Sequence, residues 1–70
     1  MSERLLVMLR ERRSDAGLTQ GELADRVGVS RKTINTVENG IFVPSTLLAL
    51  KLAAALDCAV EALFALPQDE

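Results

Sequence analysis

The sequence predicts an all-α fold of five helices without a sheet, and three observations lead to this prediction. Apolar residues make up 49% of the chain but only Phe42 and Phe64 are aromatic, so Leu, Ala and Val supply most of the packing. No run alternates apolar and polar residues as a half-buried strand does. Ser and Thr residues that start helices, and glycines that end them, recur along the chain. The 70 residues form one domain, which we expect to span residues 1–66 and to leave 67–70 as a tail.

The first helix is expected from about Ser2 to Ser14. Leu5 and Leu9 are four residues apart, which places both on one helix face. Ala16-Gly17 follows this segment, and glycine readily takes the left-handed conformation in which many helices end. The first helix is therefore expected to stop there.

The second and third helices are expected to be short and close together. Thr19 and Glu22 have the spacing of a capping box, in which the Thr side chain caps the helix and the Glu side chain bonds back to the cap. Gly28 ends this second helix. Ser30 is the expected N-cap of the third helix, over residues 31–39.

The last two helices are expected after a loop. Ser45 caps the fourth helix, which we expect to continue to residue 56. Its apolar face is marked by leucines spaced by four residues: Leu48, Leu52 and Leu56. Asp57 interrupts the pattern, and a short fifth helix is expected over residues 60–66.

The second and third helices are the pair on which the functional prediction depends. Two short helices joined by a tight turn that contains glycine have helix-turn-helix geometry. In that unit the second helix enters the major groove of DNA and its first residues meet base edges, while the first helix lies across the backbone. The segment from about residue 19 to residue 39 is therefore a candidate DNA-binding unit.

The first two positions of the third helix carry Arg31 and Lys32. The exposed N–H groups and the dipole at a helix N-terminus favour anions, typically by ~0.3–1 kcal/mol per charge, so two cations are unfavourable there. One interpretation is a solvated charged turn. The other, which we prefer, is that phosphates or guanine acceptors of DNA supply the missing negative partner.

The overall charge argues mildly against a nucleic-acid partner, but its distribution does not. The net charge is −2 and the pI is near 5.0. Residues 1–40 carry seven Lys and Arg against six Asp and Glu, a net of +1, whereas residues 41–70 carry one against four, a net of −3. An anion-binding surface would therefore be local and lie in the first half.

The segment GLTQGELADRVGVSRKTINTVENG resembles the DNA-binding core of the xenobiotic-response-element (XRE) family, which includes lambda-type repressors and Cro. The continuation PSTLLALKLAAALDCAVEALF resembles the two closing helices of that fold. The resemblance implies a compact five-helix bundle of lambda-repressor type. It also implies a homodimer that binds a pseudo-palindromic operator in double-stranded DNA, with half-sites about one turn (~34 Å) apart.

The resemblance also assigns roles to three groups of residues. The base-reading positions are Arg31, Lys32 and Thr36. The positions that contact phosphate or orient the third helix are Gln20, Ser30, Thr33 and Asn39. An ion pair that joins the first helix to the third is expected between Arg13 and Glu38. Arg10 and Arg12 lie on a charged helix face that either faces solvent or reaches phosphate.

The chain departs from the family pattern at several positions. Ala59 stands where a capping Ser or Thr is usual, which predicts fraying of the fifth helix, and Asp57 replaces a common glycine. Ile41 and Val43 replace basic or polar residues in the loop after the third helix, so this loop is expected to add little charge. Other positions that are often polar in the family are apolar here, which favours a dimer interface: Val7, Met8 and Leu47.

Catalysis and metal binding find little support. The chain has no His and only one cysteine, and no pair of carboxylates has a recognisable partner, so we expect neither an enzyme nor a metal or cofactor site. Cys58 is either a redox sensor or, as we prefer, a small apolar core residue. No apolar run is long enough to span a bilayer, and no secretion leader is recognisable, so a cytoplasmic location is expected.

The sequence therefore predicts a sequence-specific DNA-binding transcriptional regulator, and a homodimeric repressor in particular. Two alternatives stay open. One is a protein-interaction module, such as an antitoxin whose DNA binding serves autoregulation. The other is the DNA-binding portion of a larger ligand-responsive regulator.

Overall fold

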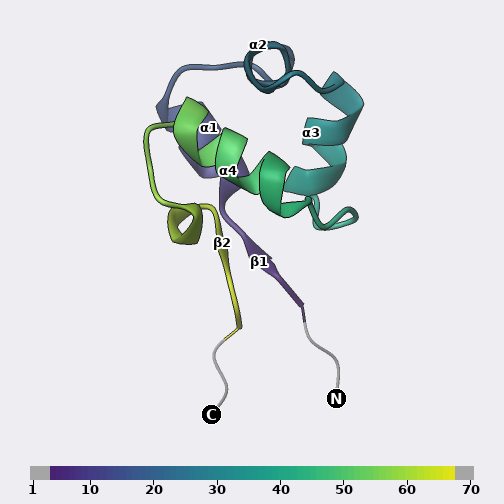
Figure 1. Ribbon diagram of the computed structural model, residues 1–70, viewed down its shortest axis with the longest axis vertical. Helices are drawn as coiled ribbons and strands as arrows, with labels where there is room; N and C mark the ends of the chain where they lie inside the picture. Colours follow the sequence, from purple (N-terminus) through teal and green to yellow (C-terminus); the bar gives the residue numbers. More distant parts are fainter. Residues whose placement is uncertain (1–3, 68–70) are drawn as a thin grey trace.

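A computed structural model describes residues 4–67, in which four α-helices surround one core and two short strands lie side by side at one end (Figure 1). The elements in chain order are β1 (Leu6–Val7), α1 (Leu9–Asp15), α2 (Gln20–Val27), α3 (Arg31–Glu38), α4 (Thr46–Ala55), the 3₁₀ helix η1 (Val60–Ala62) and β2 (Phe64–Ala65). None of the helices in this part of the chain could cross a membrane, because none is long and apolar enough.

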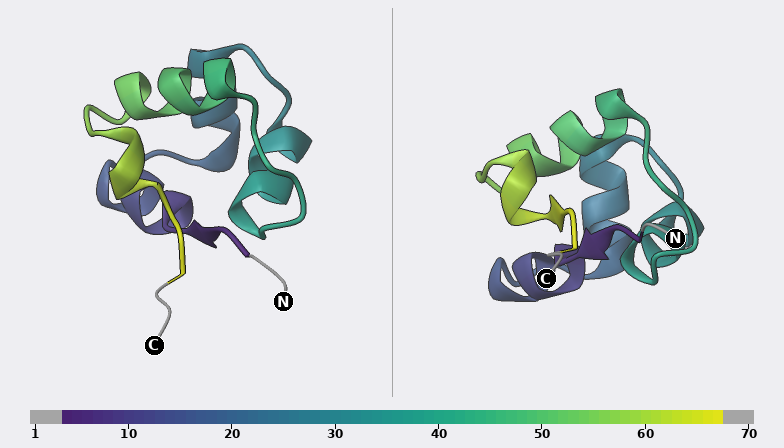
Figure 2. Two further views of the ribbon diagram at one scale, coloured as in Figure 1. Left: turned by 60° about the horizontal axis from the view of Figure 1, so that its bottom comes forward. Right: turned by 90° about the horizontal axis from the view of Figure 1, so that it is seen from below.

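Every helix contributes to the core. Figure 2 shows α4 on one side of the molecule and α1 on the other. The completely buried side chains come from all four α-helices and from the residue after η1: Leu9, Leu23, Ile34, Val37, Leu52 and Leu63. Cys58 is half-buried and packs against this core, in the manner of a small apolar residue.

Three helices start where the capping residues predict. The Thr19 hydroxyl accepts a hydrogen bond from the Glu22 N–H at 3.0 Å, and the Glu22 carboxylate accepts one from the Thr19 N–H at 2.8 Å. This capping box opens α2 and lowers the pKa of Glu22, chiefly through the bond from the Thr19 backbone. The hydroxyls of Ser30 and Ser45 each accept from the N–H three residues on, at 3.1 Å, and so open α3 and α4.

The prediction that the first helix starts at about Ser2 is wrong. The expected residues Ser2 and Glu3 lie outside the described range, and the helix begins only at Leu9. Residues 6–7 instead form β1, which pairs antiparallel with β2, and the Met8 N–H donates to the Leu63 carbonyl at 2.7 Å. These backbone groups bond across the chain rather than within a helix. The end of the helix is as expected, with Gly17 at a φ of +74°.

The predictions of a fifth helix and of a fold without a sheet are also wrong. Only residues 60–62 form a turn of 3₁₀ helix, and β2 follows directly. Ala59 has no side chain that could cap a longer helix, and the chain after η1 gains its backbone hydrogen bonds from β1 instead. Residues 68–70 of the expected tail lie outside the described range.

The turn between α2 and α3 depends on a left-handed glycine. Gly28 has a φ of +78° and donates its N–H to the Ala24 carbonyl at 2.8 Å. A Cβ at Gly28 would meet no atom within 4 Å, so its cost would come from the backbone conformation alone. This turn sets the angle between the two helices of the candidate DNA-binding unit.

We predict opposite effects for two Gly→Ala substitutions. Gly28→Ala should lower the free energy of unfolding by about 1–2 kcal/mol, because L-residues are strained at this φ. Gly21→Ala is the matched control: Gly21 lies inside α2, where a Cβ would come no closer than 3.9 Å to the Thr19 hydroxyl, and the change should stabilise by roughly 0.5–1 kcal/mol. Urea unfolding measures both. Equal effects would show that the left-handed turn carries no strain for alanine.

Candidate nucleic-acid interface

The two helices of the helix-turn-helix unit are packed tightly against each other. Of all pairs of elements, α2 and α3 have the most extensive contact. Ile34 and Val37 of α3 are completely buried and belong to the same apolar cluster as Leu23 of α2. Because one side of α3 is committed to the core, its opposite side faces solvent.

The start of α3 is exposed and cationic. Arg31 and Lys32 are the first two residues of the helix, both are exposed, and the first turn holds no acidic residue. Among residues 4–67, the ion pairs involve other arginines and leave these two cations without a carboxylate partner. The unfavourable interaction with the helix dipole is therefore not relieved within the described part of the chain.

A polar hollow joins the starts of α2 and α3. It measures about 330 Å³ and is lined by Gln20, Arg31, Lys32 and Asn35. Gln20, the first residue of α2, is half-buried and donates its side-chain N–H to Glu38 at 3.0 Å. The hollow thus combines two exposed cations with amide groups, which is chemistry suited to phosphate oxygens or base edges.

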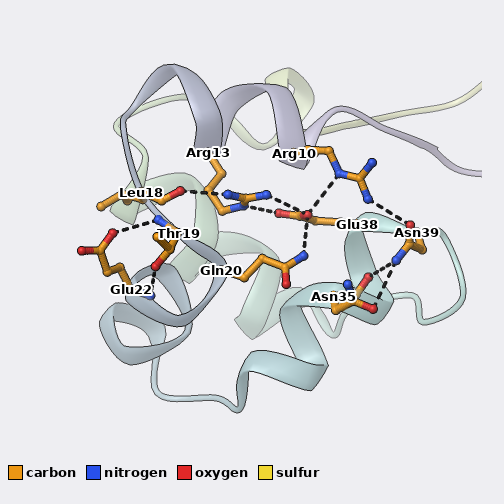
Figure 3. A network of polar contacts seen from close by, with 9 residues as sticks. All are labelled: Arg10, Arg13, Leu18, Thr19, Gln20, Glu22, Asn35, Glu38 and Asn39. Carbon is orange, nitrogen blue, oxygen red and sulfur yellow. Dashed lines mark hydrogen bonds and ion pairs between the residues drawn. The ribbon is translucent and has the colours of Figure 1, made fainter.

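A buried carboxylate at the other end of α3 holds three elements together (Figure 3). The Glu38 side chain is completely inaccessible to solvent. Its Oε2 accepts a hydrogen bond from Arg13 Nε at 2.5 Å, and its Oε1 accepts from Arg13 Nη2 at 3.2 Å and from Gln20 Nε2 at 3.0 Å. Arg10 Nε lies 3.4 Å from the same Oε1. The Arg13–Glu38 ion pair expected from the sequence is therefore present, and Gln20 and Arg10 complete it.

The network continues beyond Glu38 in two directions. Arg13 Nη1 donates to the Leu18 carbonyl at 2.8 Å, which ties the loop before α2 to α1. Arg10 Nη2 donates to Asn39 Oδ1 at 3.0 Å, which ties α1 to the residue that ends α3. We call Arg10, Arg13, Gln20, Glu38 and Asn39 the Glu38 network.

Opposing effects act on the protonation of Glu38. Burial raises the pKa of its carboxyl group. The hydrogen bonds from Arg13, Gln20 and Arg10, together with the charge of Arg13, lower the pKa by more than burial raises it, so the net shift is downward. The pKa of Arg13 is raised in turn, mainly by its hydrogen bond to Glu38. The network is therefore charged at neutral pH.

The remaining candidate residues lie along α3 but differ in what they expose. The Ser30 and Thr33 hydroxyls are 3.0 Å apart and bond to each other. The Thr36 hydroxyl donates to the Thr33 carbonyl at 2.9 Å. Asn39 donates its side-chain N–H to the Asn35 carbonyl at 2.9 Å, so its amide already has partners on both sides.

Sequence reasoning did not identify Arg10 as a partner of Glu38, nor Asn35 as part of the polar hollow. One signal was available for Arg10: it lies three residues before Arg13, so both side chains lie on the same face of α1. For Asn35 the signal was its position between the expected base-reading residues on the exposed face of α3. Neither signal alone distinguishes these residues from ordinary solvated ones.

Comparison with known proteins places the chain among helix-turn-helix proteins. The helix-turn-helix family profile matches residues 9–63. An HTH-type transcriptional regulator of Methanothermobacter thermautotrophicus is 48% identical over 63 residues, which cover 89% of this chain and 91% of that protein. Another, of Archaeoglobus fulgidus, is 44% identical over 62 residues and covers 89% of each chain.

A solved structure has the same fold and a related sequence. The restriction-modification controller protein C.AhdI from Aeromonas hydrophila superposes with a TM-score of 0.73 and is 41% identical. The match covers 77% of this chain and 82% of that one.

We predict that Glu38→Gln lowers the free energy of unfolding by about 3 kcal/mol at pH 7, because it leaves the largely buried Arg13 guanidinium without its counter-charge. The difference between the two proteins should depend on pH. The pKa of Glu38 is lower in the folded chain than its ordinary value of 4.5, so its contribution is complete above that value. It should be lost as the pH falls through the lowered pKa, where the wild-type side chain becomes neutral like glutamine.

Urea unfolding of both proteins between pH 7 and pH 3 measures this difference. Glu11→Gln is the control, since Glu11 is exposed on α1, and it should change stability by less than about 0.5 kcal/mol. A stability gap that stays constant down to pH 3 would contradict the assignment of a charged, hydrogen-bonded Glu38.

Proposed function

The chain belongs to the XRE-type helix-turn-helix family of DNA-binding transcriptional regulators, and from this membership we propose that it is a homodimeric repressor that reads operator half-sites with α3 in the major groove. The observation that carries the proposal is the pair of exposed cations at the start of α3, which have no carboxylate partner within residues 4–67. A polyanion is the partner that relieves this arrangement.

The proposed roles are those that the family resemblance assigns to these positions, and they are compatible with where the side chains lie. Arg31 and Lys32 donate to base acceptors, chiefly guanine O6 and N7. Gln20 and Asn39, whose side chains both belong to the Glu38 network, contact phosphates and fix the register of α3 on the duplex. Ser30 and Thr33 lie next to the base-reading residues at the helix start. The Glu38 network orients α3 relative to α1 and α2 while these contacts form.

Dimerisation is part of the proposal because α4 is apolar on its outer side as well as on its core side. Leu47 and Leu50 are exposed, and Lys51 is its only charged residue. Leu50 also lines an apolar hollow of about 330 Å³, together with Val43 of the loop before α4. A surface of this kind is usually covered by another protein surface. Val7, by contrast, is half-buried and packs against the core.

Repression by occlusion of a promoter is the simplest outcome of such binding. A dimer places two α3 helices on successive major grooves of one face of the duplex, about one helical turn apart. Polymerase cannot occupy the same face at the same time.

The binding proposal predicts different effects for the two lysines of the chain. Lys32→Ala should weaken binding to a duplex selected from a random library by about 1–3 kcal/mol and relax preference at one base pair. Lys51→Ala removes the same charge from α4 and should leave that preference unchanged. Fluorescence anisotropy at several salt concentrations measures affinity and its salt dependence together. Equal effects of the two variants, or affinity that does not change with salt, would contradict the proposed interface.

The dimer proposal predicts that Leu47→Asp converts the chain to a monomer, because a two-fold interface would bring both introduced carboxylates into an apolar contact. Leu66→Asp is the control: Leu66 is also exposed, but it lies after β2 and away from α4. Sedimentation velocity measures the state of each, and circular dichroism checks folding. A monomeric wild-type chain would contradict the homodimer, and a monomer produced by Leu66→Asp alone would move the interface to the strand pair.

A further inference from the structure

A second hollow lies beside α3, and its walls are mostly apolar. It measures about 330 Å³ and is lined by Lys32, Thr33, Thr36, Ile41 and Phe42. The loop after α3 folds back to form it, since the N–H groups of Ile41 and Phe42 both donate to the Thr36 carbonyl, at 3.0 and 3.2 Å. The hollow therefore joins the proposed base-reading side of α3 to Phe42 and to Ile41, of which only Ile41 stands out in the sequence, as a replacement for a basic or polar residue.

The threonines that line this hollow have their hydroxyls engaged elsewhere. The Thr36 hydroxyl donates to the Thr33 carbonyl at 2.9 Å, and the Thr33 hydroxyl is bonded to that of Ser30 at 3.0 Å. The Thr36 hydroxyl proton is therefore not free for an acceptor on an incoming ligand, whereas the threonine methyl groups can be contacted without breaking a hydrogen bond. In this geometry Thr36 offers an apolar contact rather than a new donor.

The other wall of the hollow is formed by two large apolar side chains that are exposed to solvent. Ile41 is 77% exposed and Phe42 is 46% exposed. Large apolar side chains that stand together on a surface generally mark a contact with a ligand or a partner. Lys32 also lines this hollow, and its ammonium group can donate to an acceptor next to the apolar walls.

The ligand that fits this combination carries a small apolar group directly beside a hydrogen-bond acceptor and a polyanionic backbone. In the major groove of DNA, thymine alone among the four bases has this pattern, with its C5-methyl group next to the O4 acceptor. Thr methyl groups and Phe are among the side chains that contact this methyl group.

We propose that the hollow lined by Thr36, Ile41 and Phe42 reads a thymine in each half-site through its C5-methyl group, and that Lys32 donates to an acceptor beside it. The inference rests on the proposed binding of α3 in the major groove. It makes Ile41 and Phe42 specificity-determining residues.

The test removes the methyl group from the DNA instead of from the protein. A duplex selected by the wild-type chain from a random library is resynthesised with deoxyuridine in place of one thymine at a time. This change removes the C5-methyl group and keeps every hydrogen-bonding group of the base. At one thymine per half-site the affinity should fall about three- to five-fold, the size expected for loss of one buried methyl group, with no change at the other thymines.

Protein variants then connect that thymine to the hollow. Thr36→Val keeps the methyl group and loses the hydroxyl, and it should still distinguish thymine from deoxyuridine. Thr36→Ser and Phe42→Ala should bind both duplexes with equal affinity. Leu66→Ala is the control, because Leu66 is an exposed apolar residue that follows β2 and lines neither this hollow nor the apolar hollow at α4, and it should behave as wild type.

The outcomes separate this inference from the proposed function. A selected half-site without thymine, a uniform response to deoxyuridine, or discrimination that survives Thr36→Ser and is lost in Thr36→Val would overturn the thymine contact while leaving DNA binding intact. Failure to bind any duplex of the library would overturn both.

Discussion

The buried carboxylate of Glu38 is the interaction on which the arrangement of this small domain depends. It accepts hydrogen bonds from α1 through Arg10 and Arg13 and from α2 through Gln20, while it belongs to α3 itself. A carboxylate with no solvent exposure is stable only if its charge and its lone pairs are satisfied. The three elements therefore have to keep their relative positions, and with them the direction in which α3 presents its exposed face.

The charges at the two ends of α3 indicate that this helix has a binding partner other than the described residues of the chain. The dipole of a helix favours anions at the N-terminus and cations at the C-terminus, and α3 has the reverse: Arg31 and Lys32 at its start and Glu38 at its end. At the end of the helix the conflict is resolved inside the protein by Arg13 and Arg10. At the start no carboxylate of the described residues resolves it. We infer that DNA supplies the missing negative charge. The end of α3 is then held by ion pairs within the protein, and its start forms ion pairs with DNA.

Local chemistry explains which features were predictable. The capping residues Thr19, Ser30 and Ser45 act within one helical turn, so their sequence spacing was sufficient to place the starts of α2, α3 and α4. The β1–β2 pair joins segments that are far apart in the sequence, and strands of two residues are too short for a local pattern to indicate such pairing. The convergence of Arg10 and Gln20 on Glu38 also depends on how the helices pack. The resemblance to a known family predicted the Arg13–Glu38 pair, which spacing alone could not, because the two residues are 25 positions apart.

The most direct test of this account is an amide chemical-shift titration of the isotopically labelled chain with its selected duplex. We expect the largest changes over residues 30–39, with smaller ones at the start of α2 and in the loop after α3, and little change along the outer side of α4 in a chain that is already dimeric. Changes centred on α4 and the strand pair, with the signals of Arg31 and Lys32 unmoved, would contradict the claim that the exposed start of α3 is completed by DNA.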